Sequence, residues 1–444
     1  MKPRLAQTDV AVVGGGIAGL TVACFLAREG VGVTIFEKAP ILGGRAATLE
    51  ADGFLFNRGG HALYTGGAAS RVFEELGVSY GHGIPKDTFV LHEGKLSAFP
   101  ADPIGLLRLD FLDAGDKLAL FRFFATLARE EPNGLATTSV QEWLDRKILR
   151  RPRLHRLMTA VARTFSYTTA LDLVSAELFV EKLQRSLKHP VHYIDGGWQV
   201  LVDELHRAAE QRTGAHIVEG ARVQAVELGA GRARGVRLRD GSLVRASAVV
   251  LAMGPRDAAK LVDRDVHAVL GRLVDDLIPA RVACLDVALS RLPSPGVPVV
   301  QDLDGPRFMT AQSLYSRVVP EGAALVYTFK QLDPRRHGDT HEDERDLEDL
   351  LDRAQPGWRD LLIRRQYLPR IEAVGALPTA ATGGFAGRPG HRVPGIDHLY
   401  VAGDWVGPEG FLADASLASA RRAAWLALED GAVERGEISA GAAH

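Results

Sequence analysis

The sequence predicts an α/β protein in which a domain with a parallel sheet is interrupted by a second domain of mixed helices and strands. Three observations lead to this expectation. Strand, helix and strand patterns follow one another between residues 10 and 37, another strand-like run ends in Gly403-Asp404, and the segments between lack both features. The length of 444 residues also exceeds the roughly 250 to 300 at which one hydrophobic core stops growing, so we expect two domains.

The first expected element is a βαβ unit. The apolar run Val10–Val13 has no polar alternation, which is typical of a strand buried on both faces of a parallel sheet. Good helix formers follow from Ala18 to Arg28, and a second strand-like run over 33–36 ends in Glu37. A unit of this length and order is typical of a Rossmann-like fold.

Gly14, Gly16 and Gly19 lie in the turn between the first strand and the helix. The first allows a tight turn, the second lets backbone amides approach a pyrophosphate, and the third lets the helix pack against the strand. Glu37 can accept hydrogen bonds from the ribose hydroxyls of an adenosine, and its charge would repel a 2′-phosphate. The unit therefore predicts a site for FAD or NAD rather than NADP.

A second signal follows, where Arg45 comes directly after Gly43 and Gly44, which cannot block its approach to a phosphate. With this motif the sequence resembles the flavoprotein superfamily that includes amine oxidases, protoporphyrinogen oxidase and phytoene desaturase. The resemblance covers both ends of the chain and a middle segment. It implies that FAD is the cofactor and that Gly43, Gly44 and Arg45 contact its diphosphate.

The loop Asn57–His61 is similar to a small-residue loop that passes close to the flavin ring in that superfamily. His61 is a candidate base, but a lone histidine is no catalytic constellation, and we favour a loop residue positioned by the backbone. The middle segment 215–255 alternates around a Gly-rich turn, which predicts a hairpin or meander. There the resemblance implies that a backbone group near Val223 contacts the adenine.

Near the C-terminus, residues 398–405 read as a strand ending in Gly403-Asp404. The resemblance implies that Asp404 meets a ribityl hydroxyl or the pyrophosphate, and that the helix from about 413 to 428 directs its N-terminus at the flavin. Relatives usually carry Gly-Ala at the start of this helix and Ser-Gly within it. Here these positions hold Ala415-Ser416 and Ser419-Ala420, small-for-small changes that loosen the family assignment without removing the site.

We expect no metal site, and the pair His337 and His341 is interpreted as part of a solvated loop and helix start. The residues expected to bind FAD are Gly14, Gly16, Ile17, Ala18, Gly19, Glu37, Lys38, Gly43, Gly44, Arg45, Gly59, Gly60, His61, Val223, Gly403, Asp404, Leu412 and Ala413.

The flavin-binding stretches cover 1–75, 196–265 and 385–435, so the substrate domain is expected to be discontinuous, over 76–195 and 266–384, with a flexible tail at 436–444. A helix over 116–129 is expected to bury one apolar face in the core. That face carries Leu118, Phe121, Phe124, Ala125 and Ala128. Together with the apolar run 104–107, it could instead form an apolar lip for membrane docking or substrate access.

Strand-like runs over 283–288 and 323–328 are expected to supply a sheet at the floor of the substrate pocket. Amine oxidases usually place a lysine in such a strand, where it holds a water near flavin N5. The comparable run 280–285 has no lysine, and Lys330 lies in a different run. This departure weakens the case for an amine oxidase. It favours hydride removal from carbon of a small apolar substrate, as in the desaturases and protoporphyrinogen oxidase.

No residue is assigned as the catalytic base. The weak catalytic candidates are His61, Tyr327 and Trp405; Tyr193, Trp198 and Tyr315 could likewise line the pocket or simply belong to the core. A flavin amine oxidase stays open as an alternative. A non-catalytic escort-type binding protein is less favoured, because the cofactor residues Glu37, Arg45, Gly403 and Asp404 are all present. A flavin-dependent isomerase is also less favoured, and net oxidation of a substrate would exclude it as the whole activity.

Composition sets the remaining limits, with 46% hydrophobic residues, 24% charged residues and a formal net charge of −2. The balanced charge argues against nucleic acid as a partner, because phosphate binding needs a basic excess or face. Cys24 and Cys284 lie in apolar runs and are expected to be buried free thiols. The polar first residues leave no room for a secretory signal, so we expect a cytoplasmic protein, with peripheral membrane contact left open.

Overall fold

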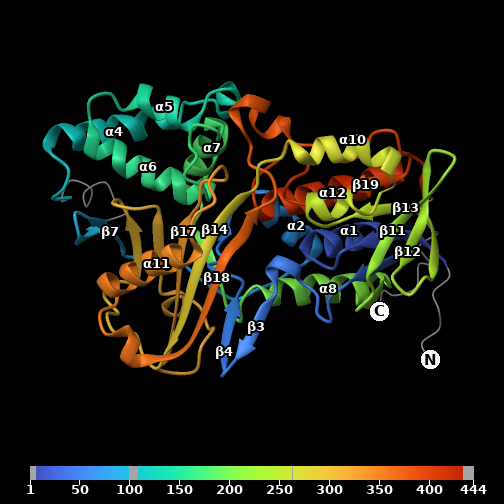
Figure 1. Cartoon of the computed structure of the whole chain (residues 1–444), viewed down its shortest axis with the longest axis horizontal. Helices are drawn as coiled ribbons and strands as arrows, with labels where there is room; N and C mark the ends of the chain where they lie inside the picture. The colour runs from blue at the N-terminus through green and yellow to red at the C-terminus, as the bar shows by residue number, and fades with distance from the viewer. Residues whose placement is uncertain (1–6, 100–108, 263, 434–444) are drawn as a thin grey trace.

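The computed structural model describes residues 7–99, 109–262 and 264–433, which form two adjoining halves (Figure 1). One half is built on a largely parallel sheet, and the other on a mostly antiparallel sheet with a layer of helices beside it. The apolar run 104–107 and the expected tail at 436–444 lie outside the described residues.

The first sheet has the strand order β10-β2-β1-β13-β12-β11, and β19 also pairs with β13. Its strands are β1 (Gln7–Val13), β2 (Val33–Glu37), β10 (His216–Glu219), β11 (Val223–Gly229), β12 (Arg232–Leu238), β13 (Leu243–Leu251) and β19 (Leu399–Val401). Strands β10, β2, β1, β13 and β19 run parallel, whereas β11, β12 and β13 form an antiparallel meander. The α/β fold class and the meander expected within 215–255 are confirmed.

Helices cover both faces of this sheet. They are α1 (Ile17–Arg28), α2 (Ala68–Leu76), α8 (Gln199–Thr213), α9 (Pro255–Ala259), α10 (Arg264–Asp275) and α12 (Ala413–Glu429). Val10 and Val12 of β1 pack into the core with α1, α8 and α12, whereas Ala11 and Val13 belong to the core beneath α10 and the meander. Both faces of β1 are therefore buried, as its unbroken apolar run predicts.

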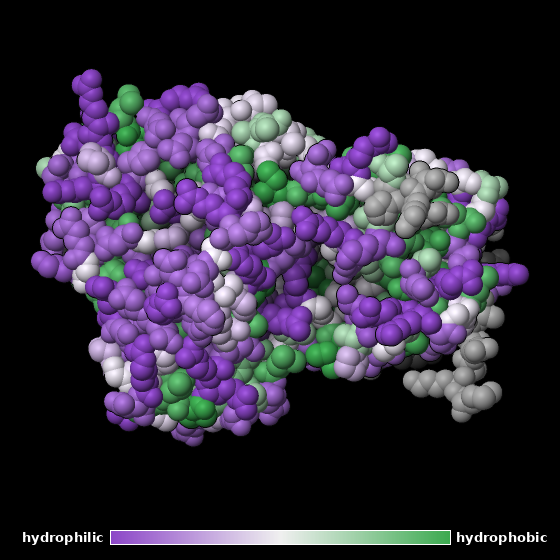
Figure 2. All heavy atoms as spheres, in the orientation of Figure 1, coloured by the Kyte–Doolittle hydropathy of each residue, from purple (hydrophilic) through white to green (hydrophobic). Residues whose placement is uncertain are grey.

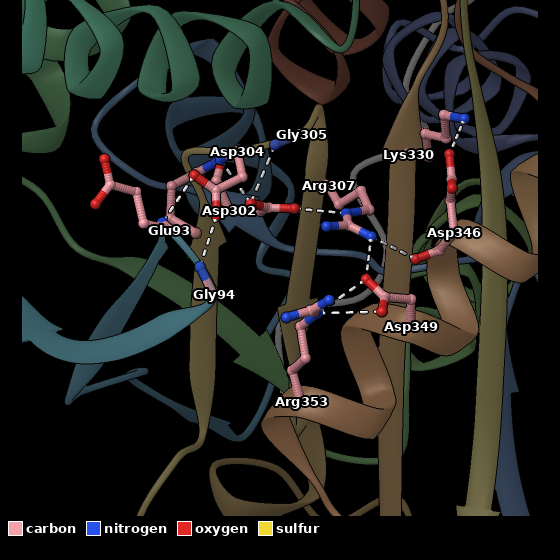
Figure 3. Close-up of polar contacts among 11 residues, drawn as sticks. Glu93, Gly94, Asp302, Asp304, Gly305, Arg307, Lys330, Asp346, Asp349 and Arg353 are labelled. Carbon is pink, nitrogen blue, oxygen red and sulfur yellow. Dashed lines mark hydrogen bonds and ion pairs between the residues drawn. The ribbon is translucent and has the colours of Figure 1, made fainter.

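The second sheet has the order β18-β14-β17-β16-β15-β7-β8. Its strands are β7 (Thr88–His92), β8 (Lys95–Phe99), β14 (Ala280–Leu289), β15 (Val299–Asp302), β16 (Arg307–Thr310), β17 (Ala324–Gln331) and β18 (Leu362–Val374). Helix α11 (Thr340–Ala354) packs on one face, where Arg307 lies between Asp302 and Asp349 (Figure 3). These ion pairs hold α11 against the sheet.

Shorter elements complete the fold. Strands β3 (Thr48–Ala51) and β4 (Phe54–Asn57) form a hairpin, and β5 (Leu63–Tyr64), β9 (Val191–Ile194) and β6 (His82–Gly83) form a small sheet. The helical layer consists of α4 (Ala114–Leu127), α5 (Val140–Lys147), α6 (Pro152–Ser166) and α7 (Ala176–Ser186). Cys24 and Cys284 are both buried thiols, as predicted.

Helix α4 contradicts the predicted buried face. Leu118 and Phe121 are 50% and 67% exposed, whereas Leu120, Phe123 and Leu127 are buried in the core of the helical layer. The helix carries two apolar stripes, and a period of 3.6 residues cannot decide which of them packs inward.

The surface on the face shown in Figure 2 is mainly hydrophilic, with apolar residues in small groups. None of the described helices combines the length and the apolar composition that crossing a membrane requires.

Candidate cofactor and active site

Two glycine loops lie edge to edge at the start of α1. The Gly43 N–H donates to the Gly15 carbonyl over 2.8 Å, and Gly16 and Gly43 form a parallel bridge. A Cβ on Gly19 would lie 1.9 Å from the Gly14 carbonyl oxygen, so only glycine lets α1 pack there. A Cβ on Gly16 would instead meet no protein atom nearer than 3.7 Å. This open cradle at a helix N-terminus fits a pyrophosphate, with the first residues of α1, Ile17 and Ala18, beside it.

Glu37 is fixed next to this cradle. One of its carboxylate oxygens accepts a hydrogen bond from the Gly15 N–H at 2.7 Å, and the other accepts the Ala39 N–H at 2.8 Å. Each oxygen keeps a further lone pair, so the carboxylate can still accept a ribose hydroxyl. The neighbouring Lys38 is exposed and pairs with Asp257 of α9 at 3.3 Å.

The fold brings the N-terminal arginine onto the C-terminal Gly-Asp pair. The two terminal nitrogens of Arg45 donate to the two oxygens of Asp404 at 2.7 and 2.6 Å. The Asp404 side chain is only 2% exposed and also accepts the Gly375 N–H at 2.9 Å. Although burial opposes it, the guanidinium holds the pKa of Asp404 below its ordinary value. Asp404 therefore orients Arg45, whose side chain is 46% exposed and keeps N–H groups for an anion.

Trp405 secures the loop that carries Asp404. Its indole N–H donates to the Met253 carbonyl at the end of β13 over 2.8 Å, and its side chain is fully buried. A Cβ on Gly403, where φ is +151°, would lie 2.9 Å from this indole nitrogen. Trp405 is thus placed as a core residue that ties the loop to the sheet.

Arg388 holds the same loop from its other side. Its buried guanidinium donates to the carbonyls of Asp404 at 3.2 Å and Gly410 at 2.9 Å. Helix α12 begins just beyond, with Leu412 at its N-cap and Ala413 as its first residue. The expected cofactor residues at this helix start are therefore held by a charged side chain that sequence reasoning missed.

The loop Asn57–His61 rests on Tyr327 of β17. The Asn57 N–H donates to the Tyr327 hydroxyl at 3.0 Å, and that hydroxyl lies 3.4 Å from the Leu55 carbonyl. Burial raises the pKa of Tyr327 far above its ordinary value. The hydroxyl is therefore neutral, and its hydrogen bonds go to the backbone of β4 behind the loop.

His61 lies between two backbone carbonyls, and its neutral ring can donate its single N–H to only one of them. Its Nδ1 lies 2.8 Å from the Gly59 carbonyl and its Nε2 lies 3.2 Å from the Arg45 carbonyl. Its ring meets the edge of Trp198, and burial lowers its pKa. This placement connects the diphosphate motif to the flavin loop through His61.

Buried polar atoms without a hydrogen bond gather around the same loop. Among the described residues these include Asn57 Nδ2, Trp198 Nε1 and Asp286 Oδ1. The backbone N–H of Trp198 donates to Asn57 Oδ1 at 3.0 Å, and Asp286 accepts the backbone N–H of Gly59. Burial raises the pKa of Asp286 well above its ordinary value. Unpaired donors and acceptors beside a glycine loop fit the hydrogen-bonding edges of a flavin.

A second feature missed from sequence is Lys182 of α7. Its ammonium lies 3.9 Å from the centre of the Tyr64 ring, and 5.2, 5.5 and 5.1 Å from the ring centres of Phe165, Tyr167 and Phe411. It donates to the Phe165 carbonyl at 2.9 Å, and burial lowers its pKa to about 7. We call these four rings the Lys182 cage.

The cage lies between the flavin loop and the start of α12. Phe411 directly precedes Leu412, the N-cap of α12. Tyr167 stacks on Phe329 of β17 with ring centres 5.8 Å apart, and a Cβ on Gly60 would lie 3.8 Å from the Phe329 ring. The cage therefore borders both segments expected to contact the flavin.

Lys330 lies on the opposite side of β17 from Tyr327 and Phe329, because side chains alternate along a strand. It pairs with Asp343 at 2.8 Å and with Asp346, both on α11, and Figure 3 shows it directed at Asp346. Lys330 is therefore turned away from the flavin loop.

The remaining predicted residues lie farther from this centre. Val223 begins β11 and belongs to the same core as Val13 and Phe36 at the ends of β1 and β2. The rings of Tyr193 and Tyr315 face each other with centres 6.2 Å apart. Within the described part of the chain, no group of three or more His, Cys, Asp or Glu side chains is placed to hold a metal ion.

Comparison with known proteins also indicates a flavoprotein. The flavin containing amine oxidoreductase family matches residues 17–281. Carotenoid 3,4-desaturase of Haloarcula japonica is 56% identical over 55 residues, which are 12% of this chain and 11% of that protein. The zeta-carotene-forming phytoene desaturase of Myxococcus xanthus is 27% identical over 285 residues, 54% of this chain and 52% of that protein. The match thus spans about half or less of these curated relatives.

An oxidoreductase structure from Methanosarcina mazei has the same fold, with a TM-score of 0.76 at 20% identity, covering 93% of this chain and 99% of that one. The family match confirms the resemblance that the motifs indicate and confirms FAD as the cofactor.

Proposed function

Because the chain belongs to the flavin containing amine oxidoreductase family, we propose that it is an FAD-dependent enzyme that removes a hydride from carbon of a small apolar substrate. One observation carries this proposal. The sheet turns Cys284 and Phe329 toward Gly59 and Gly60 of the flavin loop, together with Asp286, whose pKa is raised by burial, while Lys330 is paired with α11 on the far face. A desaturase or dehydrogenase of carbon needs no lysine-held water there.

The relatives support the same substrate class. Two of them are named as desaturases, one of carotenoids and one of phytoene. We carry that class to this chain as neutral polyenes or molecules of similar apolarity. The aromatic side chains that border the flavin loop, Tyr167 and Phe329 among them, suit such a substrate because they bury apolar surface.

FAD, when bound, supplies the acceptor for the hydride. The chain supplies the rest. Arg45, oriented by Asp404, and the N-terminus of α1 hold the diphosphate, and the N-terminus of α12 faces the flavin with a partial positive charge. Arg388 fixes the loop that leads into α12, and the aromatic walls exclude water from the reacting carbon.

The decisive test is anaerobic mixing of the FAD-loaded protein with a neutral polyene, a porphyrinogen and a primary amine. Loss of the visible absorption of the oxidised flavin with the polyene or the porphyrinogen, but not with the amine, is the expected result. Bleaching by the amine alone would replace this function with amine oxidation. Bleaching by none of the three, with FAD bound, would reject dehydrogenation of these substrates.

We also propose peripheral contact with an anionic membrane surface through the exposed apolar stripe of α4. Leu118 and Phe121 are exposed there, and Leu149, in the turn before Arg151, is 71% exposed. Arg151 pairs with Asp113 at the start of α4, which brings that turn next to the helix. Such a surface would let an apolar substrate pass from lipid to the protein.

A further inference from the structure

The Lys182 cage has the composition of an alkylammonium-binding site. Tyr64, Phe165, Tyr167 and Phe411 surround one ammonium group, and the nearest ring centre is 3.9 Å away. Ring faces attract a cation, and proteins bind quaternary ammonium groups with several rings around one cation. For a primary ammonium the Phe165 carbonyl adds a hydrogen-bond acceptor. In this chain the ammonium that fills the cage is the chain's own.

Carboxylates next to the cage attract a cation and offset part of the burial that lowers the pKa of Lys182. Arg185 of α7 donates to both Asp414 and Glu181. The second oxygen of Glu181 is buried and accepts no hydrogen bond from any described residue. With Lys182 protonated, two carboxylates face two cations, so removing the ammonium leaves an uncompensated negative charge that another cation can balance.

A narrow pocket opens onto the cage. A pocket lined by Thr65, His189, Leu412 and Asp414 extends to Tyr64, Phe411 and Lys182. The same rings border the start of α12 and, through Tyr167 and Phe329, the flavin loop. With Lys182 in place the pocket is too narrow for an organic ligand, and removing this side chain would open space beside the expected position of the flavin.

We propose that Lys182 determines substrate specificity: its ammonium occupies the place in which the cation of an amine substrate would be held, so that the site admits neutral molecules and excludes alkylammonium ions. The conclusion about substrates rests on the proposed function. The occupancy of the cage by an ammonium does not, and it can be tested by binding alone.

The test uses Lys182→Ala in the FAD-loaded protein at about pH 6, where the wild-type Lys182 carries its proton, with n-butylammonium as a replacement for the deleted side chain. Bound cation stabilises the folded state by mass action, so a concentration ten times its Kd should raise the Tm of the variant by about 1 to 2 °C. The wild type should not respond, because Lys182 already fills the cage.

Two controls separate the cage from general effects of the amine. Lys147→Ala removes a lysine that lies 5.9 Å from the single ring of Trp143, and n-butylammonium should leave its Tm unchanged. Neutral n-butanol has the same stem without the charge, and it should stabilise Lys182→Ala clearly less. Equal shifts for all three proteins, or equal shifts by both compounds, would overturn the proposal.

A second variant covers the case in which Lys182→Ala does not fold. Lys182→Leu keeps most of the apolar stem and leaves room for methylammonium, which should raise its Tm in the same way. No response of either folded variant to its cation would also overturn the proposal. Because melting needs no turnover, a failed rescue rejects the role of Lys182 even if polyenes bleach the flavin, and a successful rescue stands even if they do not.

Discussion

Arg45 and Asp404 lie 359 residues apart in sequence, and their pairing explains why both motifs are needed. Asp404 is nearly inaccessible, so its charge depends on the guanidinium and on the Gly375 N–H. A planar fork that meets a carboxylate with two hydrogen bonds leaves its remaining N–H groups in a fixed direction. The pair thus presents a preoriented cation to the diphosphate, although neither residue alone would specify that geometry.

Replacing Arg45 tests this arrangement. Arg45→Ala leaves the Asp404 carboxylate buried without its partner, which should lower the free energy of unfolding of the apoprotein by about 3 kcal/mol. FAD affinity should fall at least about tenfold, because the loss of one charge-assisted contact costs about 1.5 kcal/mol or more. Urea unfolding and titration of apoprotein with FAD measure the two effects.

Arg335→Ala is the control for this experiment, since Arg335 forms a comparable forked pair with Asp172 that is about half exposed. Its loss should cost less than about 1 kcal/mol and leave FAD binding unchanged. Equal effects of the two replacements would show that the Arg45 pair is an ordinary surface contact.

Lys182 makes stability depend on pH in a defined direction. Its pKa in the folded protein, about 7 because of burial, lies below the ordinary lysine value of 10.5. Between these pH values the unfolded chain binds the additional proton, so stability rises with pH, and the cost of burial is fully present below pH 7. From pH 7 to pH 9 the wild type should gain about 2 kcal/mol relative to Lys182→Met.

The comparison isolates Lys182 because the charged groups around it, Asp414, Glu181 and Arg185, are present in both proteins. Lys147→Met, which removes a lysine of α5, should show no such change relative to the wild type. Parallel pH profiles of the wild type and Lys182→Met in urea unfolding would contradict a depressed lysine pKa.

Residue-scale features of this kind were beyond sequence reasoning. Lys182 lies in a helix whose pattern of apolar and charged residues is that of any amphipathic helix. Its burial depends on rings from β5, α6 and the loop before α12, which no local pattern relates to one another. The roles of the glycines, in contrast, were predictable, because each is required by the backbone conformation or close packing of its own turn.

At the scale of elements, β1, α1 and β2 match the predicted unit closely, over Gln7–Val13, Ile17–Arg28 and Val33–Glu37. Their signals are local: an apolar run, a glycine turn and an acidic strand end. Helix α4 shows the limit of prediction from sequence. Its pattern predicted a helix, but the face that it buries depends on the neighbours it packs against. An element with one apolar stripe would have been placed correctly.

The turn between β1 and α1 allows folding and cofactor binding to be separated. In Gly16→Ala the new methyl meets no protein atom nearer than 3.7 Å, so the Tm of the apoprotein should change little while FAD affinity falls about tenfold or more. In Gly19→Ala the methyl would lie 1.9 Å from the Gly14 carbonyl, so α1 must shift and the apoprotein itself should be destabilised by several degrees.

Thermal unfolding of both apoproteins, followed by titration with FAD, measures the contrast. A Gly16→Ala protein that binds FAD like the wild type would show that no phosphate group approaches this glycine.

At the scale of the whole molecule, the site exists only where segments from both ends and the middle of the chain meet. The sheet order sets β1 beside β2 and β13, and β19 on the far side of β13, so the loops after β1 and β19 come to one edge. The carboxyl ends of parallel strands are where such folds bind ligands. The meander and the start of α11 were recognisable from sequence. Which side of the second sheet faces the flavin loop was not, and it is shown by the contacts of Tyr327 with this loop and by the ion pair of Lys330 with α11 on the other side (Figure 3).

The exposed stripe of α4 gives a prediction for the intact protein. In flotation with vesicles that contain an anionic lipid, the wild type should bind, and added salt should weaken binding because the exposed Arg122 and Arg150 contribute electrostatically. Phe121→Asp should lower the affinity for vesicles about tenfold or more, since burying a phenylalanine contributes about 1.5 to 3 kcal/mol. Because Phe121 is 67% exposed, the replacement should leave the Tm unchanged.

Leu243→Asp provides the matched control, because Leu243 is an exposed apolar residue, 43% accessible, at the start of β13 in the other half of the molecule. Vesicle binding should survive this change while it is lost in Phe121→Asp. If both replacements act alike, or if neither acts, the contact does not involve α4, and an apolar substrate must reach the flavin from solution or by another face of the protein.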